Sequence, residues 1–216
     1  ADRLARLRPN SRFLLPIAPT TSEAELLLFA GESNPIAASY GSSVMECSDG
    51  LLVTKAGTRI RLLKEHPAHG PLSQCALALT TVGANTAELG ALGVPMIVIV
   101  PTQHLAVMQA WDGAIGLLAR LPLLRRLIGG LLSLWRLRNN GLMAWPNISA
   151  GRVVVPERVG AITPQQIAEE ASDWLDAPER LQGQRDDLQA LRGQPGAVAA
   201  LAEEVRQLLP RQLESA

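Results

Sequence analysis

The sequence predicts a domain of the α/β class, built on a parallel sheet that is flanked by helices. Two observations support this prediction. The stretch Cys75–Pro101 passes from an apolar run through a glycine turn and a helical segment to a second apolar run. Another apolar run, Arg12–Ala18, precedes a segment that opens with a helix-capping signature, Thr21–Ala30. Strands that alternate with helices favour parallel pairing, so we expect a Rossmann-like sheet.

The stretch Cys75–Pro101 is predicted to form two buried strands joined by one helix. The strands are the apolar runs Cys75–Thr80 and Met96–Val100. Between them Gly83 makes a turn, the helix covers Asn85–Leu92, and Gly93 ends it. The two strands should therefore be parallel.

The turn at Gly83 is the first candidate for a ligand site. Backbone amides at the start of a helix lack intrahelical partners and lie at the positive end of the helix dipole, which suits a phosphate group. Glu88, one turn into the helix, is a carboxylate that could hold a sugar hydroxyl. A glycine turn and a helical glutamate also occur in many α/β domains without a ligand, so the motif needs support from its context.

Composition narrows the class of protein. The chain has 216 residues, 19% charged and 47% hydrophobic, which is typical of a globular protein that leans towards a membrane or an interface. The formal net charge is zero, which argues against nucleic acid as a general partner. The two cysteines, Cys47 and Cys75, lie far apart in the sequence and are interpreted as reduced thiols of a cytoplasmic protein.

The first residues indicate that the sheet continues beyond this chain. Residues Ala1–Pro9 have the pattern of the end of an amphipathic helix, and the apolar run Arg12–Ala18 follows them. A sheet that opens on a helix lacks the strand that should come before it. We therefore expect that the first strand of this domain precedes Ala1 in a longer protein.

Between Thr21 and Leu63 the pattern changes from a helix to a hairpin. Ser22 and Glu25 have the spacing of a capping box at the start of a helix. Residues Gly31–Gly50 are rich in Ser, Gly and Asn and are predicted to be a loop. Leu51–Thr54 and Arg59–Leu63 flank a glycine turn, which predicts a β-hairpin.

Metal binding is not predicted, although two histidines lie close together. His66 and His69 have a spacing that can bind a metal ion, but no third ligand lies nearby in the sequence. We interpret both as residues of a solvent-exposed loop.

The carboxyl-terminal part is predicted to be one loop followed by helices over residues 164–216. The loop covers Gly141–Glu157 and turns at Pro146-Asn147. The first helix has a capping signature at Thr163 with proline in its first turn. The second ends near Gly193, and the third covers Pro195–Leu209 with apolar residues at helical spacing.

Residues 103–140 form an apolar and basic insertion. No acidic residue occurs from Gly113 to Pro156, and Ile115–Leu137 is rich in leucine. Arginines and a Gly-Gly pair interrupt the apolar run, so it is too short to span a bilayer. We predict short helices on the membrane surface, and the alternative is a helical hairpin that covers the core or a dimer interface. The residues expected to face the membrane are Leu117, Leu118, Arg120, Arg125, Arg126, Trp135 and Arg136.

Several stretches together resemble the carboxyl-terminal half of lipid-A-disaccharide synthase. They are Gly83–Met96 (GANTAELGALGVPM), Pro146–Glu157 (PNISAGRVVVPE) and the terminal helix pair with Asp176–Arg180 (DAPER). Arg12–Pro19 (RFLLPIAP) is also similar to the second strand of that domain. The resemblance covers roughly two thirds of the chain, and its most specific part is Pro146–Glu157. The first stretch is shared with related glycosyltransferases such as the peptidoglycan enzyme.

The resemblance implies a two-lobed glycosyltransferase of the GT-B type, in which residues 1–216 form the donor-binding lobe. Such an enzyme transfers an acylated glucosamine from UDP to a lipid-linked sugar, with inversion and without a metal or other cofactor. It works at the cytoplasmic face of the inner membrane, as a peripheral protein. Matching positions imply that the residues contacting the UDP-sugar donor are Gly83, Asn85, Thr86, Glu88, Asn147 and Arg152.

Within that set the resemblance implies different roles. Gly83, Asn85 and Thr86 would approach the diphosphate. Glu88 would hold the ribose or sugar hydroxyls. Asn147 and Arg152 would line the donor side of the cleft between the lobes.

The chain departs from the family pattern in three respects. Val82 and Ala84 stand where the family has small hydroxyl residues, so two side-chain donors to phosphate are missing and backbone amides remain. The Leu- and Arg-rich insertion is longer than its equivalent in the family. The amino-terminal lobe, where the acceptor and the general base belong, is not among these residues, so this chain alone is not expected to complete the reaction.

Two other functions fit the same fold. A protein that has lost catalysis could use the Leu- and Arg-rich insertion to hold a membrane or a partner, and Val82 and Ala84 favour that alternative. A nucleotide-sugar epimerase would need an acid and base pair, and the sequence offers no candidate pair. His104 is the histidine closest to the predicted turns, and its default interpretation is a surface or core residue.

Overall fold

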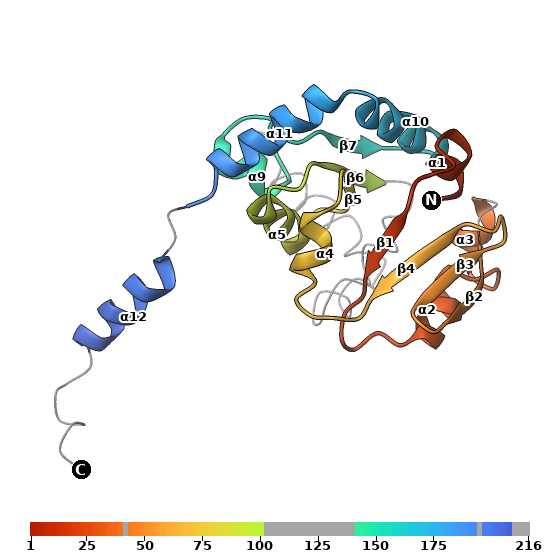
Figure 1. Ribbon diagram of the computed structural model, residues 1–216, viewed down its shortest axis with the longest axis horizontal. Helices are drawn as coiled ribbons and strands as arrows, with labels where there is room; N and C mark the ends of the chain where they lie inside the picture. The colour runs from red at the N-terminus through yellow and green to blue at the C-terminus, as the bar shows by residue number, and fades with distance from the viewer. Residues whose placement is uncertain (41–42, 102–140, 194–195, 209–216) are drawn as a thin grey trace, which may run out of the picture.

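The computed structural model describes residues 1–40, 43–101, 141–193 and 196–208. In this part of the chain the fold is α/β, with helices packed against two sheets (Figure 1). One sheet is parallel and has the strand order β5-β6-β7, and the other is mixed and has the order β1-β4-β3-β2. The predicted class is therefore confirmed, but the strands form two sheets where the sequence predicted one.

The parallel sheet contains the predicted strand-helix-strand unit. Strands β5 (Ala78–Thr80) and β6 (Met96–Pro101) pair in parallel, with α5 (Ala84–Leu92) between them. Strand β7 (Glu157–Gly160) adds to the other side of β6, also in parallel. Strand β5 begins later than the apolar run suggested, because Cys75 lies just beyond the carboxyl end of helix α4 (His69–Ser73).

Both faces of β6 are covered by helices, which explains its continuous apolar sequence. Met96 and Val98 pack on one face with Leu89 of α5 and Leu188 of α11. Ile97, on the opposite face, packs against helices α1 and α10. The bounds of the covering helices are α1 Asp2–Leu7, α9 Trp145–Ala150, α10 Pro164–Leu175 and α11 Pro178–Ala190.

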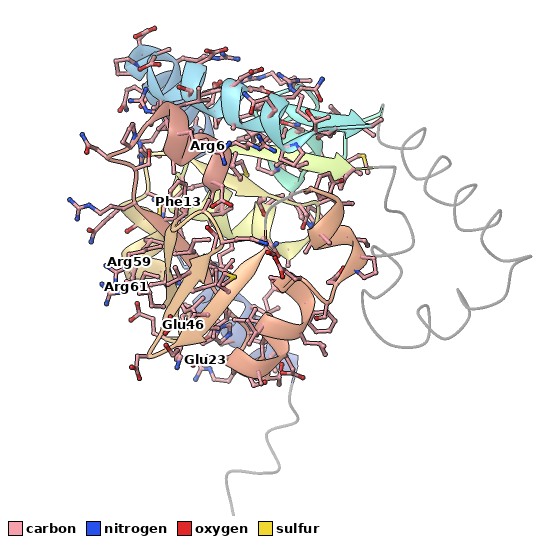
Figure 2. The ribbon with its side chains drawn as sticks, turned by 90° about the vertical axis from the view of Figure 1, so that its right-hand side faces the viewer. Arg6, Phe13, Glu23, Glu46, Arg59 and Arg61 are labelled. Carbon is pink, nitrogen blue, oxygen red and sulfur yellow. The ribbon has the colours of Figure 1, made fainter. Side chains whose placement is uncertain are left out.

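The mixed sheet joins the first predicted strand to the predicted hairpin. Strand β1 (Phe13–Pro16) is parallel to β4 (Arg59–Leu63), which pairs antiparallel with β3 (Leu51–Thr54). One face packs through Leu52 and Leu62 against apolar residues that include Leu26 of helix α2. On β4, Arg59 and Arg61 alternate with these buried positions and lie at the surface (Figure 2).

The prediction that Gly31–Gly50 is a loop was wrong in part. Helix α2 (Glu23–Ala30) is followed by a short helix, α3 (Pro35–Ser39), and by strand β2 (Val44–Ser48), which pairs with β3. Helix α3 starts because the Asn34 side chain accepts a hydrogen bond from Ile36 N and proline occupies its first turn. Composition indicated a loop, whereas a local cap and the pairing with β3 decided the outcome.

Both predicted capping boxes are confirmed. Ser22 Oγ accepts from Glu25 N while the Glu25 carboxylate accepts from Ser22 N. Thr163 and Gln166 make the same reciprocal pair at the start of α10. These side chains fix the first turn of each helix, and with it the direction in which the helix leaves its loop.

The prediction for Gly141–Glu157 was also wrong in part. Pro146 and Asn147 lie in the first turn of helix α9 and do not form an open turn. The last helix, α12 (Ala197–Leu208), lies close to its predicted range. None of the helices in the described residues is long and apolar enough to cross a membrane. The insertion at 103–140, with its predicted membrane-facing residues and His104, lies outside the described residues.

Candidate functional site

The start of helix α5 is the centre of the candidate site. Strand β5 ends at Thr80, and α5 begins at Ala84 after an N-cap glycine, Gly83, with φ of 147° and ψ of −165°. Glycine adopts this backbone conformation readily and residues with a Cβ do not. No side chain caps this helix. Its first backbone N–H groups therefore lie at the carboxyl end of a parallel strand, where open α/β sheets bind ligands.

Thr86 joins this helix start to that of α9. Its side chain is fully buried, and its hydroxyl donates to Gly83 O at 2.9 Å and accepts from Trp145 N at 3.1 Å. One hydroxyl thus fixes the turn at Gly83 and places the first residue of α9 beside it. Because both bonds are internal, we assign Thr86 to positioning the site and not to direct contact with a ligand.

Asn85 and Glu88, two of the predicted site residues on α5, reach the solvent. Asn85 is exposed, and its Nδ2 makes a long contact of 3.4 Å with Thr80 Oγ1. The Glu88 side chain is 41% exposed and its Oε1 lies 3.0 Å from His69 Nε2 of α4. The sequence had assigned His69 to a solvent loop, and the structure places it against the carboxylate that was predicted to hold a sugar hydroxyl.

Asn147 is buried, and its side chain holds the loop that leads to β7. Its Oδ1 accepts from Val154 N at 2.7 Å and from Val155 N at 2.8 Å. Its Nδ2 donates to Val155 O at 2.8 Å and to Glu157 Oε1 at 2.7 Å. Both amide protons and the carbonyl oxygen have partners inside the protein, so this side chain supports the site from behind.

Glu157 is a site residue that sequence reasoning did not single out. Its carboxylate accepts from Met143 N, Ala144 N and Asn147 Nδ2, and so it occupies the start of α9. Anions are stabilised at this end of a helix. Glu157 could have been found from the Val-Pro-Glu sequence, in which a carboxylate directly follows an apolar run.

The Arg152 side chain pairs with a carboxylate of α11. Its Nη2 donates to Asp187 Oδ1 at 2.8 Å, and its side chain is 57% exposed. The hydrogen bond to Asp187 raises the pKa of the Arg152 guanidinium. The structure therefore brings Gly83, Asn85 and Glu88 to one helix but does not bring the Arg152 head group to them.

No group of three or more potential ligands that could hold a metal ion occurs among the residues that the structure describes. Cys47 and Cys75 are both free thiols, and burial raises the pKa of each. The polar groups around Gly83 and Glu88 include backbone amides, the Asn85 side-chain amide, the Glu88 carboxylate and the His69 imidazole. Such a set can bind an anion and a hydroxyl-bearing ligand side by side.

A scan against protein-family models, a search of curated proteins and a search of solved structures each found no significant match for this chain.

Proposed function

We propose that this chain is the donor-nucleotide lobe of a membrane-associated glycosyltransferase similar to lipid-A-disaccharide synthase. The reaction would transfer an acylated glucosamine from UDP to a lipid-linked sugar. The observation that carries the proposal is the uncapped start of α5 behind Gly83, at the carboxyl end of a parallel strand, with Glu88 one turn further on.

In this proposal the diphosphate lies against the first backbone amides of α5, with the exposed Asn85 side chain as a further donor. The positive end of the helix offsets the negative charge of the diphosphate. Glu88 accepts a hydrogen bond from a ribose or sugar hydroxyl, and its contact with His69 is exchanged for the ligand. An exposed polar contact of this kind is worth at most about 1 kcal/mol, so the exchange costs little.

The buried residues have a supporting role in the same proposal. Thr86 and Asn147 fix the relative positions of α5, α9 and the loop to β7, so the amides stay in place when the ligand binds. Preorganised donors of this kind need no rearrangement when charge develops on the leaving diphosphate. Arg152 would have to leave Asp187 to reach a donor, so we rank its contribution below that of Glu88.

A non-catalytic protein that binds a membrane or a partner is the second candidate function. The observation in its favour is the apolar surface at the end of α2, where Leu28 is 62% exposed and Phe29 is 67% exposed. A donor lobe does not need such a surface for its chemistry, whereas a protein that docks onto another surface does. This function requires no affinity for UDP.

Calorimetric titration with UDP and with UDP-N-acetylglucosamine distinguishes the two functions. The proposal predicts saturable binding that weakens at least tenfold in Glu88→Gln and stays unchanged in Glu179→Gln, a control on the exposed first turn of α11. Equal affinity of the two variants, or no binding by the unmodified chain, would contradict a donor lobe.

A further inference from the structure

Helix α12 has an apolar face that is largely exposed in the part of the chain that the structure describes. It carries apolar residues at helical spacing, and Leu201 is 62% exposed and Val205 49% exposed. Figure 1 shows α12 standing apart from the rest of the fold. Helix α10 has the same length of 12 residues and the same kind of pattern, but it buries its apolar face against the parallel sheet.

A groove with an apolar wall lies close to the place where α12 leaves the fold. It has a volume of about 340 Å³ and lies between α5, α9 and α11. Its wall on α5 is made of small residues, Ala87, Gly90 and Ala91. Small residues let another helix approach closely. Two large apolar side chains border the groove and are partly exposed, Trp145 at 52% and Leu191 at 36%.

The connection between the two elements is short. Gly193 lines the groove, and α12 begins at Ala197. Gly196 has a φ of 107°, a conformation that suits a chain reversal. Connections of about 2–8 residues join neighbouring helices in bundles, and α11 and α12 have nearly equal lengths of 13 and 12 residues. A tethered segment also has a high effective concentration at its own groove.

Charge favours the groove over a lipid surface as the site for α12. The helix has Glu203 and Glu204 against a single arginine, Arg206, which already pairs with Glu203. Helices that lie on anionic membranes are rich in Lys and Arg instead. The groove has a positive side chain, Arg192, on its lining.

We propose that α12 folds back beside α11 and lays the face that contains Leu201 and Val205 into the groove between α5, α9 and α11. The docked helix covers Trp145 and Leu191. It also braces α5 against α9, the two helices whose starts meet at Thr86.

Cysteine cross-linking in the full chain tests this docking. The background is Cys47→Ser with Cys75→Ser, and Ala91→Cys supplies the thiol in the groove. The second thiol is introduced at Leu201 or Val205, on the apolar face, and at Gln207 as the control on the polar face of the same helix. The readouts are the rate of disulfide formation and the mass of the product, at two protein concentrations.

The expected result is an intramolecular disulfide for Leu201→Cys or Val205→Cys that forms at least tenfold faster than for Gln207→Cys, independently of concentration. Products that are mostly covalent dimers would show that α12 binds a second copy and would overturn the proposal. Equal rates for the apolar and polar positions would overturn it as well. As a second measurement, the rate of backbone amide hydrogen exchange in α5 and α9 should rise in Leu201→Asp and not in Gln207→Asp. An unchanged rate in Leu201→Asp would count against docking.

Discussion

The helices α5 and α9 start side by side, yet their first turns are filled differently. At α9 the Glu157 carboxylate accepts from Met143 N and Ala144 N, so a protein anion already occupies that helix start. At α5 the N-cap is Gly83, and no side chain caps the helix. The comparison teaches that side-chain oxygens of Glu157 and Thr86 accept from the backbone N–H groups around the start of α9, whereas no side chain caps α5, where we propose that a ligand binds.

Substitution of Asn147, which holds the loop beside the start of α9, should lower the free energy of unfolding the most. Asn147→Ala removes the partners of Val154 N and Val155 N, which stay buried. Each unsatisfied buried group costs about 1–3 kcal/mol, so we expect a loss of about 3–5 kcal/mol in the free energy of unfolding. Urea unfolding measures it, and Asn34→Ala, which removes a partly buried helix cap, is the control with an expected loss of about 1 kcal/mol. Similar losses for the two variants would show that the loop does not depend on Asn147.

Substitution of Gly83, the N-cap of α5, should have the next largest effect on the free energy of unfolding, because it strains the backbone. Gly83→Ala places a Cβ at a φ of 147°, which costs about 1–3 kcal/mol although no atom clashes with it. The matched control is Gly183→Ala inside α11, where space is also open and alanine should stabilise the helix by about 0.5–1 kcal/mol. Opposite signs in thermal unfolding are the expected outcome. A stabilised Gly83→Ala would mean that the turn is not held as described.

The link between the two helix starts should have a smaller effect. Thr86→Val keeps the shape of the side chain but loses the bonds to Gly83 O and Trp145 N. We expect a loss of about 1–2 kcal/mol, and Thr86→Ser, which keeps the hydroxyl, should lose less. Chemical unfolding of both variants measures the difference. If serine and valine cost the same, the hydroxyl does not join the two helices.

The smallest effect on stability is expected for the exposed carboxylate at the open site. Glu88→Gln changes the contact of this carboxylate with His69, in which both side chains are about half exposed. Exposed pairs contribute about 0–1 kcal/mol, so the midpoint of unfolding should hardly change. Thermal unfolding checks this, with His69→Gln as the partner variant. A large loss in Glu88→Gln alone would assign the residue to the fold instead of to a ligand.

The sequence predicted the elements that depend on local signals. Capping boxes at Ser22 and Thr163 and the glycine turns around α5 placed those helices to within a few residues. It did not predict that α9 is a helix, because its start is held by Glu157, a residue that lies beyond the helix in the chain. Long-range partners of this kind leave no local pattern.

The same distinction applies to the candidate site. Gly83, Asn85 and Glu88 lie within one turn and one helix, so their proximity followed from their spacing. The contact of His69 with Glu88 and the burial of Asn147 depend on tertiary packing. Spacing therefore indicated which residues gather at the site but not which of them face the ligand.

The most direct test of the open helix start is to follow the backbone amide resonances of the chain during titration with UDP, and with uridine as the control that lacks phosphate. We predict that the largest shifts fall on Ala84 and Asn85, occur with UDP and not with uridine, and leave Met143 and Ala144 nearly unchanged. Shifts centred on Met143 and Ala144, or equal shifts with uridine, would contradict the assignment of the open helix start as a diphosphate site.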